Sequence, residues 1–89
     1  FLLGDEEARE ELRAWLAALR PGELEALLAW VQGGFSHKRA ARALGIHLNT
    51  LRYRLRRVEE KLSVSLQDPE DRFHLELAAR ILLLQNKKR

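Results

Sequence analysis

The chain has 89 residues, of which 46% are hydrophobic and 33% charged, a composition typical of a small globular domain rather than a disordered segment. It contains no cysteine, which excludes disulfide frameworks, thiolate catalysis and cysteine-based zinc sites. Every apolar run is far shorter than the roughly 18 residues that cross a bilayer, so we expect a cytoplasmic domain with no membrane segment. The sequence does not begin with Met, and we expect it to be a fragment of a longer protein.

The formal net charge of +3 is distributed unevenly along the chain. Residues 1–35 carry seven acidic and three basic side chains, whereas residues 36–61 carry eight basic and two acidic ones. The last 28 residues are close to balanced, with five basic and four acidic side chains. Since the phosphate backbone supplies most of the affinity in nucleic-acid binding, a basic segment of this kind is the expected footprint of a nucleic-acid binder.

Two helices are predicted in the first third of the chain. Residues 5–19 fit a helix capped by Asp5, with apolar residues at helical spacing: Ala8, Leu12, Trp15, Leu16 and Leu19. We expect it to end at residues 20–22, because Pro21 disfavours helical backbone at the residue before it. It is interpreted as a packing support, with a linker helix or a dimer surface as the alternative.

The second helix is expected over residues 23–32 and ends at Gly33 and Gly34. Its buried stripe is predicted to comprise Leu24, Leu27, Leu28 and Val31. Trp30 lies off that stripe, and we favour a core position for it over an interface position. Phe35 is expected to pack just before the next helix as part of a hydrophobic staple.

Residues 36–62 predict two helices separated by a sharp turn. Ser36 is a good N-cap for a helix over residues 37–44, and Gly45 supplies the left-handed conformation that such a turn needs. Ile46 is expected to plug the core between the two helices. In the following helix, over residues 48–62, the predicted buried residues are Leu51, Leu55, Val58 and Leu62. That phase turns a polar and basic face outward, as in the recognition helix of a helix-turn-helix motif.

A last helix is predicted from Asp68 to about residue 85, with Asp68 as its cap and Pro69 at its first position. One predicted stripe comprises Phe73, Leu77, Ile81 and Leu84, and other apolar residues widen it: Leu75, Ala78, Ala79 and Leu82. A helix that is apolar over so much of its circumference is either deeply buried or packs against a second copy, and we favour the homodimer contact. Residues 86–89 form a basic tail that we expect to fray.

The predicted fold class is therefore all-α, with about five helices in one domain spanning residues 1–89. We expect supporting helices within residues 5–34, a helix-turn-helix over residues 36–62 and a C-terminal helix over residues 68–86. The pattern excludes the usual enzyme motifs, since it has no nucleophile context, no glycine-rich phosphate loop and no paired-acid cleft. The three histidines are not spaced as metal ligands, so no metal or other cofactor is expected.

From Ala41 onward the sequence resembles a known family. The string of His47, Asn49, Thr50, Leu51, Tyr53, Arg54 and Leu55 is similar to the core of the C-terminal helix-turn-helix domain of PucR-family bacterial transcriptional regulators. The helix start at residues 68–72, Asp-Pro-Glu-Asp-Arg, lies at the expected distance, whereas Ser63 stands where the family pattern has glycine. The two-helix unit also resembles the DNA-binding end of Fis. The resemblance implies a Fis-like DNA-binding output domain of a longer regulator whose upstream sensory regions vary.

Ten residues are predicted to contact double-stranded DNA: Ser36, Lys38, Arg39, His47, Leu48, Asn49, Thr50, Arg52, Tyr53 and Arg56. Arg52 and Arg56 suit a guanine edge or a phosphate, and Asn49 suits adenine or a phosphate, with solvation and helix capping as the respective alternatives. Thr50 is expected to contact a phosphate or to cap the helix, and His47 to contact a phosphate or a base or to cap the helix. For Tyr53, backbone contact and packing over the neighbouring helix stay open.

The residues of the preceding helix and two further arginines are expected to have less direct roles. Ser36, Lys38 and Arg39 are candidates for positioning the domain on the DNA backbone. Arg54 and Arg57 lie further round the helix, where phosphate contacts or pairs with glutamates are expected. Two other functions are kept as alternatives: a dimerisation or protein-interaction module that binds acidic partners or RNA polymerase, and a nucleoid-type architectural DNA binder.

Overall fold

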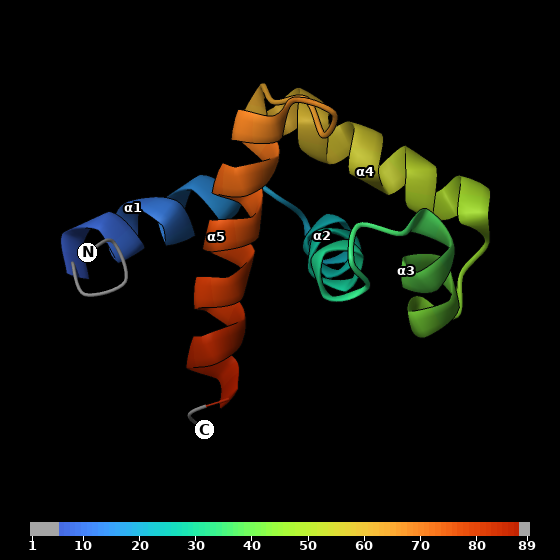
Figure 1. The fold of residues 1–89 in the computed structure, drawn as a ribbon, viewed down its shortest axis with the longest axis horizontal. Coiled ribbons are helices and arrows are strands. Elements are labelled where there is room, and N and C mark those ends of the chain that lie inside the picture. The colour runs from blue at the N-terminus through green and yellow to red at the C-terminus, as the bar shows by residue number, and fades with distance from the viewer. Residues whose placement is uncertain (1–5, 88–89) are drawn as a thin grey trace.

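The structure is a computed structural model that describes the backbone of residues 6–87 and the side chains of residues 6–84. This part of the chain is all-α and contains five helices, in agreement with the predicted fold class. They are α1 (Glu6–Leu16), α2 (Pro21–Gln32), α3 (His37–Leu44), α4 (Leu48–Leu62) and α5 (Pro69–Lys87) (Figure 1). None of these helices has the length and apolar character needed to span a membrane.

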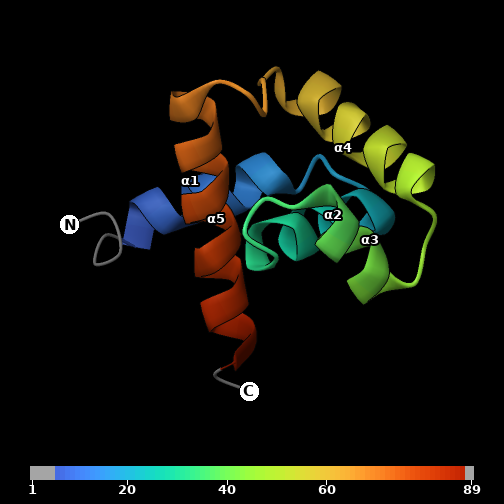
Figure 2. The same ribbon diagram turned by 45° about the vertical axis from the view of Figure 1, so that its right-hand side comes forward.

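The centre of the fold is α2, which packs against α3, α4 and α5. Leu27, Trp30 and Val31 are almost completely buried, and Ala26 and Ala29 are buried on the adjoining side, so α2 presents apolar side chains over most of its circumference. Trp30 belongs to the core, as predicted, and its indole ring meets Phe35 edge-to-face with the ring centroids 4.9 Å apart. Of the predicted stripe of this helix, Leu24 and Leu28 are only half-buried. Helix α1 packs instead on α5, on the far side from α3 and α4 (Figures 1 and 2).

The boundary between the first two helices differs from the prediction. Helix α1 ends at Leu16, three residues earlier than expected, although Leu19 beyond it is still buried. Helix α2 starts at Pro21 rather than at Glu23, because proline is well suited to the first helical position, where its missing N–H is not needed. Arg20 before it is extended, as the residue preceding proline was expected to be. The predicted cap, Asp5, lies outside the described residues.

The helix-turn-helix segment has the predicted boundaries. The Ser36 Oγ accepts a hydrogen bond of 3.2 Å from the backbone N–H of Arg39, which caps α3. Gly45 adopts the left-handed conformation with φ of 66°, and the N–H of Ile46 donates to the carbonyl of Ala41 at 3.0 Å. These bonds end α3 abruptly, and α4 begins after only three intervening residues. Ile46 packs against the core between the two helices, as predicted.

The connection from α4 to α5 is tied down by polar contacts at its centre. Leu66 is buried, and its backbone N–H donates to the carboxylate of Glu59 at 2.8 Å. The guanidinium of Arg72 donates twice to the carbonyl of Leu66, at 2.8 and 3.0 Å, and lies 5.6 Å from the centre of a Trp30 ring. Asp68 caps α5 by accepting from the N–H of Glu70, as expected. The position of α5 is therefore fixed against the end of α4.

Helix α5 has two apolar faces rather than one wide stripe. Leu75, Ala78 and Ala79 are buried, together with Ile81. Phe73 and Leu84, which were predicted to share one apolar stripe with Ile81, are 58% and 55% exposed. The prediction grouped residues by helical spacing alone, which does not show which side of the helix faces the core. In the structure, the side that carries Leu75 faces the core. The helix also continues to Lys87, past the predicted end near residue 85.

Candidate nucleic-acid interface

One side of α4 is packed and the other is free. Leu51, Leu55 and Val58 are at most 1% exposed, because they occupy the groove between α2 and α3. The opposite side carries exposed polar, basic and aromatic residues: Asn49, Thr50, Arg52, Tyr53 and Arg56. Tyr53 is 60% exposed, which argues against the alternative that its side chain packs over a neighbouring helix. This surface of α4 therefore offers donors, acceptors and positive charge in one place.

The N-terminal end of α4 is capped by a histidine. The Nδ1 atom of His47 accepts a hydrogen bond of 3.1 Å from the backbone N–H of Asn49. Because Nδ1 is used as an acceptor, the proton of the neutral ring lies on Nε2, which remains free to donate outward. The capping role considered for His47 is thus observed, and it leaves one nitrogen for a ligand. Leu48 beside it is half-buried and packs partly against the core.

Helix α3 contributes two further exposed basic residues. Lys38 and Arg39 lie exposed in its first turn, whereas Ser36 is half-buried and uses its hydroxyl as the helix cap. The capping bond leaves the Ser36 hydroxyl hydrogen available as a donor. Helices α3 and α4, which carry these basic residues, pack against each other and lie side by side in both views (Figures 1 and 2).

A hollow runs along one flank of α4, where it faces the start of α2. It is lined by residues of both helices and the preceding turn: Arg20, Gly22, Glu23, Thr50, Tyr53, Arg54 and Arg57. The guanidinium of Arg54 lies over Gly22, where an added Cβ would be 3.5 Å from its central carbon. A Cβ at this distance would be in ordinary van der Waals contact, so the guanidinium of Arg54 packs closely on the backbone of Gly22. Thr50 and Tyr53 connect this hollow to the exposed face of α4.

A second hollow lies on the other flank of α4, toward α3 and α5. Arg52 and Arg56 of α4 line it, with His37 at the start of α3 and Gln67 and Arg72 from the beginning of α5 and the loop before it. Three guanidinium groups and one carboxylate, that of Glu59, line this surface, so it is cationic. The sequence analysis assigned no role in binding to Arg20 on the first flank or to Gln67 and Arg72 on the second, whereas it considered a phosphate contact for Arg54. Arg20, Gln67 and Arg72 come from segments outside the two-helix motif, and spacing along the sequence gives no signal for that proximity.

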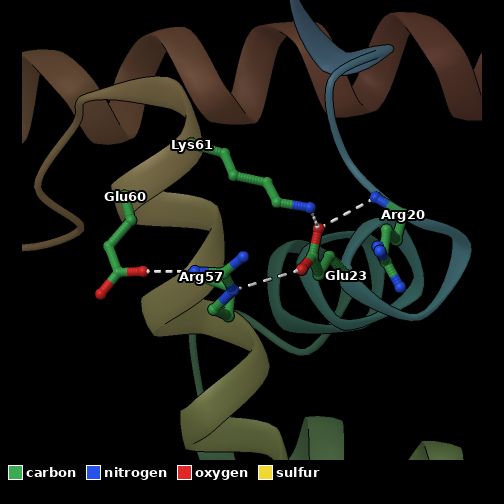
Figure 3. A network of polar contacts seen from close by, with 5 residues as sticks. All are labelled: Arg20, Glu23, Arg57, Glu60 and Lys61. Atoms are coloured by element: carbon green, nitrogen blue, oxygen red, sulfur yellow. Dashed lines mark hydrogen bonds and ion pairs between the residues drawn. The ribbon is translucent and has the colours of Figure 1, made fainter.

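The scaffold beneath α4 is held by a buried carboxylate. Glu23 is only 7% exposed and accepts from the Nζ of Lys61 at 2.8 Å and from the backbone N–H of Arg20 at 2.9 Å (Figure 3). Its other oxygen lies 3.8 Å from the Nε of Arg57, which also pairs with Glu60 at 2.8 Å. The hydrogen bond from Lys61 lowers the pKa of Glu23, against the opposing effect of burial. Arg57 therefore belongs to an internal network rather than to the exposed face.

The described residues contain no cluster of histidine, aspartate or glutamate that could hold a metal ion. The chemistry available at the α4 surface is hydrogen bonding and attraction of negative charge. A short helix, a glycine turn and a second helix with an exposed basic face define a helix-turn-helix domain.

Comparison with known proteins identifies the family. The PucR C-terminal helix-turn-helix domain matches residues 24–81, and the chain belongs to this family of DNA-binding regulatory domains. A protein of Thermomonospora curvata, described as an uncharacterized protein in the pkwA 5' region, is 36% identical over 80 residues. The match covers 83% of this chain and 44% of that protein, so the chain spans less than half the length of its relative. No solved structure matches the chain significantly.

Proposed function

We propose that this domain binds DNA sequence-specifically, with α4 as the recognition helix in the major groove, as the cytoplasmic output module of a longer regulator. The observation that carries the proposal is the outward presentation of Asn49, Arg52 and Arg56 from a helix whose opposite face is completely packed. The N-terminal half of a second helix in this motif contacts base edges, and those three side chains have the donors and acceptors to read them.

The surrounding residues suit contacts to the DNA backbone. The free Nε2 of His47, the hydroxyl of Thr50 and the exposed cations of α3, Lys38 and Arg39, all offer donors to phosphate oxygens. Tyr53 extends the same surface with an exposed hydroxyl. Such contacts fix the register of a domain on the duplex, while base contacts give specificity. The partly exposed Leu48 suits apolar contact with a thymine methyl group.

A regulator of this kind is expected to act as a homodimer. Two copies related by a twofold axis would read an inverted repeat whose half-sites lie about 34–36 Å apart, one turn of the duplex. Selection of bound sequences from random DNA tests this directly, since a palindromic consensus is the expected product. A selection that returns no consensus would favour an architectural binder instead.

Replacing Arg52 or Asn49 by alanine should weaken specific binding. A good bidentate base contact is worth about 1–3 kcal/mol, so we expect a loss of about 10- to 100-fold in affinity for the selected sequence. Thermal unfolding should be unchanged, because both side chains are exposed. Fluorescence anisotropy with labelled DNA measures the affinity.

Arg13→Ala is the matched control for the arginine variant, since it removes the same charge from α1, far from α4 (Figure 1). The control should bind the selected sequence as the unmodified domain does. Unchanged affinity in both Arg52→Ala and Asn49→Ala would contradict the assignment of α4 as the recognition helix.

A further inference from the structure

The outer face of α5 carries an apolar seam with no partner among the described residues. It consists of Phe73, Leu77, Arg80 and Leu84, spaced by four, three and four residues. At about 100° per residue these positions share one side of the helix, opposite Leu75 and Ala79 in the core. Phe73 and Leu84 are more than half exposed, and the C-terminal half of α5 projects past the other helices (Figures 1 and 2). Exposed seams with this heptad spacing are how helices pair.

The surface of the seam is already shaped for another helix. One apolar hollow is lined by Phe73, Glu76, Leu77 and Arg80, four residues at positions i, i+3, i+4 and i+7 of α5. This is the set of four residues that forms a hole for an incoming side chain in knobs-into-holes packing. A second hollow follows it directly, lined by Arg80, Leu83 and Leu84 with Gln32 from the end of α2. Two consecutive holes along one face fit an approaching helix rather than a small molecule.

We propose that the partner on this seam is α5 of a second copy of the chain, packed antiparallel. The spacing of four, three and four is the same read in either direction, so a twofold axis at the middle of the seam matches it to itself. That arrangement puts Phe73 against the partner's Leu84 and Leu77 against the partner's Arg80. An isologous interface needs this self-complementarity.

The charges on the seam agree with that pairing. Arg80 is 55% exposed and pairs with Glu76 one turn earlier, with Nε and Oε2 2.9 Å apart. In the antiparallel arrangement Arg80 faces the partner's Leu77, beside the partner's Glu76, so each arginine gains a second carboxylate. A polar residue at one seam position lowers stability but selects register and orientation. The proposal specifies the dimer that the proposed function invokes, and its tests contain no DNA, so either idea can fail without the other.

The first test is the oligomeric state of the chain by sedimentation equilibrium over a range of protein concentrations. We expect a reversible dimer, and Phe73→Glu should raise its dissociation constant by about tenfold or more, because each copy then places a charge against the apolar Leu84 of its partner. Ala14→Glu, at an exposed site on α1, adds the same charge away from the seam and should leave the constant unchanged. A chain that stays monomeric throughout, or equal effects of both variants, would overturn the proposal. Circular dichroism verifies that both variants are folded.

The second test uses the absence of native cysteine to determine orientation. Phe73→Cys and Leu84→Cys are prepared as separate single variants and oxidised alone or as a mixture. Antiparallel packing predicts efficient disulfide formation in the mixture and little in either variant alone, read on a non-reducing gel. Efficient cross-linking of Phe73→Cys with itself would instead show parallel helices and would overturn the antiparallel interface.

Discussion

Arginine residues of the basic segment have different roles, and only their surroundings separate them. Arg52 and Arg56 are exposed on α4, whereas Arg57, one residue further, pairs with Glu60 and approaches Glu23. Arg72 is held by the carbonyl of Leu66 and lies over aromatic rings. The same guanidinium group is thus a ligand-binding candidate, a salt-bridge partner or a packing element, depending on whether its donors are already occupied.

Backbone strain is also a residue-scale feature, at the end of α4. Ser63 adopts the left-handed conformation with φ of 56° at the C-cap, and Val64 donates to the carbonyl of Glu59. A residue with a Cβ is disfavoured there by roughly 1 kcal/mol relative to glycine. The family pattern that the sequence resembles has glycine at this position, and the structure retains the glycine-like backbone with serine in its place.

Ser63→Gly should therefore raise the free energy of unfolding by up to about 1 kcal/mol, which corresponds to a melting temperature a few degrees higher. Thermal denaturation followed by circular dichroism measures the change. Ser63→Ala keeps the Cβ and should give no such gain, so it serves as the control. A glycine variant no more stable than the alanine variant would show that the strain at Ser63 is negligible.

At the scale of elements, the ion pair between α2 and α4 fixes the position of the proposed recognition surface. The carboxylate of Glu23 lies in the first turn of α2 and is bridged by Lys61 in the last turn of α4 (Figure 3). Each charge stabilises the helix end on which it lies, because it has the sign opposite to that end of the helix dipole. Since α4 is the helix that presents Asn49 and Arg52, this ion pair orients the surface as well as joining two helices.

The ion pair between Glu23 and Lys61 predicts a specific pH dependence of stability. The pKa of Glu23 is lowered in the folded state, chiefly by the hydrogen bond from Lys61. Its stabilising effect is therefore complete above the ordinary glutamate pKa of about 4.3 and is lost as the pH falls through the lower folded value. Glu23→Gln should lower the free energy of unfolding by about 1–3 kcal/mol at pH 7 and flatten its dependence on pH below about 5.

Urea denaturation at several pH values provides the measurement. Glu25→Gln, two residues further along α2 but exposed, is the matched control and should follow the unmodified chain at every pH. If both variants had the same pH profile, the link between Glu23 and acid sensitivity would be wrong.

At the scale of the whole molecule, charge is separated between its ends. Helix α1, with four glutamates and two arginines, lies on one side of α5, and α3 and α4, with eight basic and two acidic residues, lie on the other (Figure 1). A field of this form steers the basic end toward a polyanion and turns α1 away from it. The two hollows flanking α4 widen the cationic surface beyond α4 itself.

If the hollow at the start of α2 takes a phosphate, its arginines should affect the salt dependence of DNA binding more than its specificity. Arg54→Ala and Arg20→Ala should each reduce the magnitude of the slope of log K against log salt by about 0.9. The ratio of specific to non-specific affinity should stay constant in these variants, whereas Arg52→Ala should lower it. Anisotropy titrations at several salt concentrations provide both quantities. An unchanged slope in Arg54→Ala would remove this flank from the interface.

The sequence by itself determined the local elements and the central motif. Ser36, Gly45 and the apolar spacing of α4 predicted the boundaries of α3 and α4, because capping, left-handed turns and helical periodicity act over a few residues. The exposed face of α4 followed from the same periodicity. These features depend on residues close together in the chain, so they can be predicted from the local sequence.

The tertiary structure decided what depends on distant segments. In the folded chain the Leu75 side of α5 lies in the core, and Phe73 and Leu84 are exposed. Helical periodicity defines both apolar faces of α5, but it does not show which of them packs against α1 and α2. The tertiary structure also joined Glu23 to Lys61 across 38 positions and brought Arg72 to the flank of α4. Contacts of this range form only when the helices pack, and no local pattern encodes them. The second face of α5 is the feature that packing left without a partner among the described residues.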